Sequence, residues 1–381
     1  MEIMSSIMAE LDSRNSYKRE VYAPYYVCSF ATHVFNLMNQ TREVYWEGKK
    51  LPNMRLHILF VAPPGFMKTY YMSVMGGDKY SVFAQCGIKM GQEQAITEAG
   101  LIGTFNNIAG TPIEQEGAAR ALAKGILMID EFSAITNALK VQYNSQMDSQ
   151  LLAALDHGNV NKRLGSGKIE YQTNFTLWAG VQPARYDLTS GLGRRMCFLL
   201  FLPIRLDNDK LLEAMHHARG IRPSTIEINE LWGKIEAWRK SMDIIDKVTY
   251  DDDVFQMYRK LGIFSYESSY FDRLILGWHL ATYGPDREIH VSVKHKELLE
   301  IIDREKRWRD DIAQGVDYIQ LLKMIKVYGV EVDGHIDISR ASLVSEGIMV
   351  GWNAQQIYEM LVEMSKYGLV TLKGSSVLLE V

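Results

Sequence analysis

The sequence predicts an α/β protein: a parallel sheet covered by helices, then a helical lid, then a small domain of three helices and a β-hairpin. Within residues 51–206, short apolar runs of strand length alternate with helix-compatible stretches, which is typical of parallel strands buried on both faces. From 207 to 312 the pattern is helical, and we expect an all-α lid. Residues 315–381 contain three helical segments and then two short strand candidates, which is the order of a winged-helix domain.

The composition is that of an ordinary globular protein. The net charge is −4, 47% of the residues are hydrophobic and 23% are charged, which excludes disordered and collagenous chains. Any nucleic-acid contact must therefore come from a local basic patch. The three cysteines are too far apart for a zinc knuckle or a disulfide framework, and no apolar run reaches the length of about 20 residues that spans a bilayer. We expect a cytoplasmic protein with no membrane contact.

The two ends of the chain differ in character. Residues 1–50 are predicted to be a helical lead-in whose aromatic side chains pack on the next domain. Residues 315–381 carry eight carboxylates against five lysines and arginines, whereas a helix that reads DNA usually presents a basic rim. This favours a winged helix that contacts protein or regulates the core, with DNA binding as the alternative.

A candidate phosphate-binding loop follows the first apolar strand. A loop of this kind needs a tight turn between a strand and a helix, a lysine for the phosphates and a Ser or Thr for Mg²⁺. Here Lys68 and Thr69 stand in register with the pattern GxxxxGK[ST], although Ala62 and Met67 replace its two glycines. A Pro-Gly turn followed by a chance Lys-Thr is the alternative. The candidate nucleotide-binding residues are Pro64, Gly65, Phe66, Met67, Lys68 and Thr69.

Polar side chains follow the next strands at the points where these end. The apolar run at 126–129 ends in Asp130 and Glu131, which we expect to complete the Mg²⁺ shell and to polarise the attacking water, respectively. The run at 175–181 ends in Gln182, whose amide can bind that water or the γ-phosphate; a strand-terminal amide facing solvent is the alternative. Arg194 and Arg195 precede a fourth run and can stabilise transition-state charge from a subunit edge, or serve only a structural role.

These segments resemble the core of MCM replicative helicases, which are AAA+ ATPases. Residues 125–132 resemble the family's IDEF run with its preceding glycine, and residues 150–158 and 179–187 are similar to its LLEALE and AANP…GRYD segments. Arg194-Arg195-Met196 stands where the family has SRF, and Met67 occupies the place before the lysine where MCM loops carry a small residue other than glycine. The resemblance covers about residues 55–310 and implies an AAA+ P-loop NTPase core that uses ATP and Mg²⁺.

The resemblance also implies roles for further residues. Gln182 stands at the sensor 1 position, where the family has Asn; Arg195 is the better arginine-finger candidate; and Arg273 lies where the family has its sensor 2 arginine. Fewer than 60 residues precede the core, so we expect the family's N-terminal DNA-binding domain to be missing from this chain.

A β-hairpin is predicted at residues 158–172. Two short strand candidates flank a Gly-Ser-Gly tip, and Lys162, Arg163 and Lys168 are expected to cluster near it. In MCM-like ATPases the equivalent hairpin contacts the DNA backbone, so these residues are the candidate DNA-binding residues; a solvated surface hairpin is the alternative. A second insertion is expected at about residues 88–118.

The resulting hypothesis is an ATP-driven DNA motor or helicase that forms a ring, expected to be a homo-hexamer. DNA would lie in the central channel, and replication proteins would dock on the winged helix. A replication initiator or ATP switch that binds DNA without translocating is the first alternative, and an AAA+ transcription activator is the second.

Overall fold

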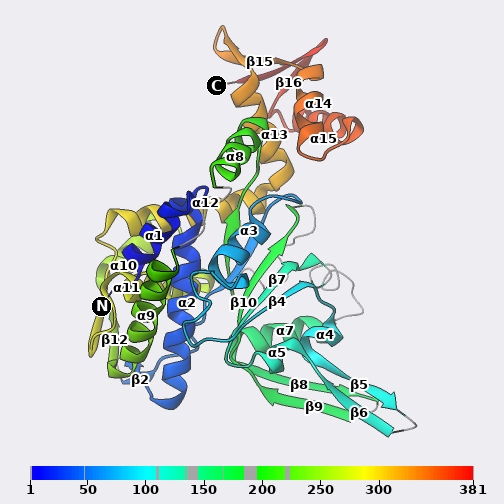
Figure 1. Cartoon of the computed structure of the whole chain (residues 1–381). Helices are drawn as coiled ribbons and strands as arrows, with labels where there is room; N and C mark the ends of the chain where they lie inside the picture. The colour runs from blue at the N-terminus through cyan, green and yellow to red at the C-terminus, as the bar shows by residue number, and fades with distance from the viewer. Residues whose placement is uncertain are drawn as a thin grey trace.

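A five-stranded sheet forms the centre of the protein (Figure 1). The computed structural model describes residues 2–46, 48–108, 111–133, 135, 145–165, 167–183, 195–218 and 224–380. The strand order is β11-β3-β10-β7-β4, and every neighbouring pair is parallel. The strands are β3 (His57–Val61), β4 (Met90–Ala95), β7 (Ile126–Glu131), β10 (Thr176–Val181) and β11 (Met196–Leu200). The predicted α/β class with a parallel sheet is confirmed.

The sheet is buried on both faces, which explains why its inner strands are apolar throughout. Along β3, Ile58 and Phe60 join one hydrophobic cluster, while Leu59 and Val61 join a second cluster. The first cluster includes helix α2 (Arg19–Thr41), which packs against α11 (Ser265–Tyr283). The second includes residues of α7 (Ser145–Asp156). The N-terminal helix α2 is therefore part of the main core.

Short helices and two hairpins connect the strands. Helix α1 (Met4–Ser13) precedes all the strands; the connecting helices are α3 (Lys68–Met72) with the π-helix Ser73–Gly77, α4 (Glu98–Ile102) and α5 (Ala118–Ala121). The hairpin expected at 158–172 is present as β8 (Asn159–Leu164) and β9 (Gly167–Gln172), beside a second hairpin of β5 (Gly103–Ile108) and β6 (Thr111–Glu116). The insertion expected at 88–118 begins later than predicted, because its first residues form β4, the polar edge strand of the main sheet.

The segment 207–312 is mostly helical but contains two strands that the sequence did not predict. Its helices are α8 (Arg205–Ala218), α9 (Thr225–Lys240), the 3-10 turn Ser241–Ile244, α10 (Asp252–Lys260), α11 and α12 (Lys296–Gln314). Strands β12 (Lys247–Tyr250) and β13 (Glu288–Val291) form a small sheet with β1 (Tyr45–Trp46) and β2 (Lys49–Lys50). The expectation of a purely helical segment was wrong here because each strand has only four residues and two buried side chains, too short a pattern to stand out in the sequence.

The C-terminal domain has a hydrophobic core of its own, which includes Leu321, Ile357 and Leu361. Its elements are α13 (Val316–Tyr328), β14 (Val330–Val332), β15 (His335–Ser339), α14 (Arg340–Met349), α15 (Ala354–Lys366), β16 (Thr371–Lys373) and β17 (Ser376–Glu380). The strands form one antiparallel sheet in the order β14-β15-β17-β16, and the first two were not predicted. Figure 1 shows this domain at the end of the molecule opposite to the two hairpins. Across the described ranges, no helix has both the length and the apolar character to cross a membrane.

Candidate active site

The candidate phosphate loop connects β3 to α3. Gly65 and Met67 both have positive φ, 80° and 56°. Glycine adopts such angles without strain, whereas a non-glycine residue in this region stores on the order of 1–3 kcal/mol. The Met67 side chain is buried in the main core, and its packing offsets that strain. The loop therefore turns through a left-handed backbone at the position where the GxxxxGK[ST] pattern has glycine.

Lys68 begins α3 and points back into the loop. Its Nζ donates to the carbonyl oxygens of Ala62 and Pro63, at 2.6 and 2.8 Å. Burial lowers the pKa of Lys68 to about 8, against the opposing attraction of Glu131 and Asp130. A buried ammonium that is bound only by neutral carbonyls in this loop suits an anionic ligand such as a phosphate, because a nearby negative charge stabilises the charged form of the lysine. Thr69, the next residue, is exposed.

The two carboxylates at the end of β7 have different partners. The Gln182 amide Nε2, at the end of β10, donates to Glu131 Oε2 at 3.1 Å, and Glu131 Oε1 accepts from the backbone N–H of Ser133 at 3.2 Å. Gln92 Nε2 lies 3.4 Å from both carboxylate oxygens of Asp130, whose pKa is raised by burial. The structure thus brings Glu131 and Gln182 into direct contact.

Two residues of this site were missed at the sequence level. Gly180 on β10 packs against the Lys68 side chain: a Cβ at position 180 would lie 2.6 Å from the Asp130 carbonyl oxygen and 2.9 Å from Lys68 Cδ. Gln92 was missed because the polar strand β4 was taken for the beginning of an insertion. Its only signal is a polar strand-length segment beside the predicted strands, which by itself is weak.

The site fits a magnesium nucleotide on its own residues. Mg²⁺ keeps several waters and is bound by one or two protein oxygens plus the phosphates of its nucleotide. Thr69 and Asp130 provide such oxygens, and Lys68 provides the charge for the phosphates. No group of three or more His, Cys, Asp or Glu side chains that could hold a metal by itself occurs among the residues described.

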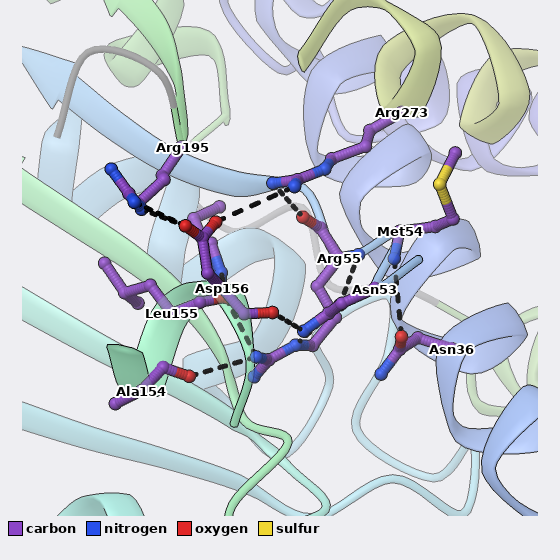
Figure 2. A network of polar contacts seen from close by, with 10 residues as sticks. Asn36, Asn53, Met54, Arg55, Ala154, Leu155, Asp156, Arg195 and Arg273 are labelled. Atoms are coloured by element: carbon purple, nitrogen blue, oxygen red, sulfur yellow. Dashed lines mark hydrogen bonds and ion pairs between the residues drawn. The ribbon is translucent and has the colours of Figure 1, made fainter. Parts of the chain in front are cut away.

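Arg195 and Arg273 lie at the opposite edge of the sheet from Lys68, and Figure 2 shows both beside Asp156. Arg195 immediately precedes β11, whose first residue, Met196, is in register with His57, the first residue of β3. Arg273, on α11, contacts the backbone carbonyl of Arg55, just before β3. The five residues of β3 separate this edge from the phosphate loop by roughly 15 Å, at about 3.3 Å per residue. Arg194 lies outside the described residues.

The three basic hairpin residues do not form one cluster. The side chains of a strand alternate between its faces, so Lys162 points away from its neighbour Arg163 and forms an ion pair of 2.8 Å with Glu98 on α4. Lys168 faces Arg163 across the hairpin and forms an ion pair with Glu170. Arg163 is exposed. The expected clustering of all three near the tip was therefore wrong, because packing against α4 draws Lys162 inward.

Two groups of predicted residues result, one at each edge of the sheet. Lys68, Asp130, Glu131 and Gln182 meet at the carboxyl edge, where the parallel strands end. Arg195 lies with Arg273 at the amino edge, where the strands begin. No protein-family model matches this chain, and no curated protein matches its sequence. Its chemistry is therefore inferred from its own residues.

Proposed function

We propose that this chain is a Mg²⁺-dependent ATPase of the AAA+ class, with a core that resembles that of MCM helicases and with a C-terminal winged helix. The observation that carries the proposal is the convergence of Lys68, Asp130, Glu131 and Gln182 at the carboxyl edge of a parallel sheet. Ligands of open α/β sheets bind at this edge. Lys68 follows β3, Asp130 and Glu131 end β7, and Gln182 follows β10. The fold therefore brings together groups from three strands that lie far apart in the sequence.

The residues divide the work of phosphoryl transfer to water. Lys68 binds the phosphates, and Pro64, Gly65, Phe66 and Met67 shape the loop around them. Thr69 and Asp130 hold Mg²⁺, which neutralises charge on the phosphate oxygens when bound. Glu131 accepts a proton from the attacking water, and Gln182, already bonded to Glu131, orients that water.

The position of the arginines supports action between subunits. Arg195 and Arg273 lie at the far edge from Lys68 of the same chain, so they can serve a nucleotide only in a neighbouring copy. An arginine supplied in trans stabilises the charge of the transition state. This arrangement supports a closed ring, with a hexamer as the proposed form.

DNA is the proposed substrate of the ring. The hairpin β8–β9 projects from the sheet and carries the exposed Arg163, whose charge suits a phosphate contact without sequence preference. The order and pairing of the C-terminal elements support a winged helix. Its helix α15 exposes Glu359, Glu363, Tyr358 and Val362, a surface that suits replication proteins better than the DNA backbone.

A specific observation also favours the alternative of an initiator or ATP switch. Lys162 and Lys168 form ion pairs with carboxylates, so the hairpin offers fewer unengaged cations than its sequence suggests. Weak contacts with the DNA backbone are sufficient for an assembly that binds an origin. A translocating motor must instead remain bound to the strand during each step.

The decisive experiment measures ATP hydrolysis with Mg²⁺, with and without DNA, and then strand displacement on a forked substrate. Glu131→Gln should reduce turnover by roughly 10²–10⁴-fold while ATP binding persists, because it removes only the group that activates water. The matched control is Glu93→Gln, which replaces an exposed carboxylate on β4. Its turnover and its ATP binding should equal those of the parent. Unchanged turnover in Glu131→Gln contradicts the role of Glu131, and a parent that hydrolyses no ATP contradicts the ATPase assignment. Hydrolysis stimulated by DNA without strand displacement favours the switch.

A further inference from the structure

The last residue of helix α7, Asp156, lies at the centre of the network at the amino edge of the sheet (Figure 2). Arg55 Nη2 donates to the carbonyl oxygens of Ala154 and Leu155, at 3.0 and 2.9 Å, and Asn53 Nδ2 donates to that of Asp156 at 2.6 Å. Arg55 is itself fully buried and bonded to Asn53. Three successive carbonyls are therefore fixed by side chains, and the backbone that presents the Asp156 carboxylate has little freedom to move.

The Asp156 carboxylate joins the two arginines. Its Oδ2 accepts from Arg195 Nε at 2.6 Å and also contacts Arg195 Nη2. Its Oδ1 lies 3.8 Å from Arg273 Nη2, and Arg273 Nη1 donates to the Arg55 carbonyl at 3.4 Å. The side chains of Asp156 and Arg195 keep about a fifth of their surface exposed, 21% and 18%. The pair of Asp156 and Arg195 is thus fixed through hydrogen bonds to the backbone at Asp156, while part of its surface remains accessible to a ligand.

Several ionisable groups meet in the described part of this network. Three guanidinium groups, of Arg55, Arg195 and Arg273, lie near the carboxylate of Asp156. Asp272 is the other acid near Arg273, and burial raises its pKa to about 6. Desolvation lowers the pKa of Arg273, and the nearby charge of Arg195 adds to this effect. Arg195 keeps part of its side chain exposed, and guanidinium groups suit the bidentate binding of phosphates.

We propose that Asp156 is a positioning residue: it holds Arg195 and Arg273 as one preassembled pair that meets the triphosphate of a neighbouring copy of this chain. The inference rests on the proposed ATPase function. An arginine side chain that is already fixed loses less conformational freedom when it binds the phosphates, and a displacement of about 1 Å can slow a reaction on the order of 100-fold. Asp156 itself touches no nucleotide; it acts through the two arginines.

The first test is Asp156→Asn, which keeps the shape and removes the charge. We expect kcat to fall on the order of 100-fold, while the affinity of the chain's own site for a fluorescent ATP analogue stays unchanged, since that site lies at the other edge. Assembly promoted by a non-hydrolysable ATP analogue, followed by analytical ultracentrifugation, should weaken in parallel. The matched control is Asp246→Asn, which also removes a carboxylate shared by two arginines, Arg42 and Arg287, but in the small sheet.

Asp156→Glu keeps the proposal testable if the Asn variant does not fold. It preserves the charge but moves the carboxylate outward by one methylene, so a positioning role predicts lower kcat and weaker assembly with the analogue at a melting temperature close to that of the parent. Parent-like kcat and assembly in either folded variant overturn the proposal. Equal loss in Asp156→Asn and Asp246→Asn also overturns it, because a general loss of stability then explains both.

Mixing experiments separate this inference from the proposed function. A chain with Glu131→Gln retains its arginines, and a chain with Asp156→Asn retains Glu131, so mixed assemblies should hydrolyse ATP faster than either variant alone. If Glu131→Gln is complemented by Arg195→Ala but not by Asp156→Asn, the role of Asp156 alone is refuted. If neither mixture gains activity, the action of the arginines between copies is refuted as well. A parent that neither binds nor hydrolyses ATP refutes the proposed function, and the inference with it.

Discussion

Replacing Gly180 by Ala should disable the nucleotide site from the strand behind it. The added Cβ would lie 2.6 Å from the Asp130 carbonyl oxygen, a backbone atom, and 2.9 and 3.2 Å from Cδ and Cβ of Lys68. Comfortable non-bonded separations are about 3.5–4.0 Å, so these groups must move by roughly 0.5–1 Å. Overpacking of this kind typically destabilises by about 1–3 kcal/mol. The displaced Lys68 would then lose its alignment with the phosphates.

The assay pairs ATP binding with thermal unfolding. Gly180→Ala should bind a fluorescent ATP analogue much more weakly and hydrolyse ATP on the order of 100-fold more slowly, with a lower melting temperature. Gly233→Ala is the matched control: Gly233 is exposed on α9, and nothing lies within 4 Å of its added Cβ. Alanine there should add up to about 1 kcal/mol of helix stability and leave ATP binding unchanged. Parent-like affinity and melting temperature in Gly180→Ala would refute the packing argument.

Two further predictions concern single cations. Because burial holds the pKa of Lys68 near 8 and bound phosphates would raise it, ATP binding above pH 8 should take up a proton and weaken by up to about tenfold per pH unit. Calorimetry at pH 8.5 in two buffers of different ionisation enthalpy measures that uptake, and Lys68→Arg, which stays charged, should abolish it; equal heats in both buffers for the parent would contradict the assignment. In the hairpin, Arg163→Ala should reduce the salt slope of DNA binding by up to about 0.9. Lys162→Ala should leave that slope nearly unchanged and mainly remove the ion pair with Glu98. Filter binding at several salt concentrations measures both slopes; a larger change in Lys162→Ala than in Arg163→Ala would assign the DNA contact to Lys162.

The carboxyl-edge residues could be predicted because each follows a buried strand. Asp130, Glu131 and Gln182 stand at the ends of apolar runs, Lys68 follows another apolar run after the loop 62–67, and parallel strands end at a common edge. The sequence pattern therefore contains both the residue types and the reason for their proximity. The candidate phosphate loop could be singled out despite Met67, since the lysine and threonine keep their register even where a side chain replaces the glycine.

Other features depended on contacts that no local pattern encodes. Position 180 must be glycine because the Lys68 side chain packs against it, and this contact exists only in the folded sheet. Lys162 was placed near the hairpin tip, but its partner Glu98 comes from a helix far away in the sequence. Asp156 and Arg195 are 39 residues apart and meet only because α7 ends at the edge where β11 begins. Such tertiary pairs carry no signal of period or spacing.

The central claim is that this chain is an ATPase whose arginines act on a neighbouring copy. The most direct test measures turnover per chain across a dilution series, with the assembly state followed by sedimentation. The parent should show turnover per chain that rises with protein concentration as copies associate, and Arg195→Ala should stay low at every concentration, by about 10³-fold or more at saturation. Turnover per chain that stays constant down to the monomer, or an Arg195→Ala variant that matches the parent, would contradict the account.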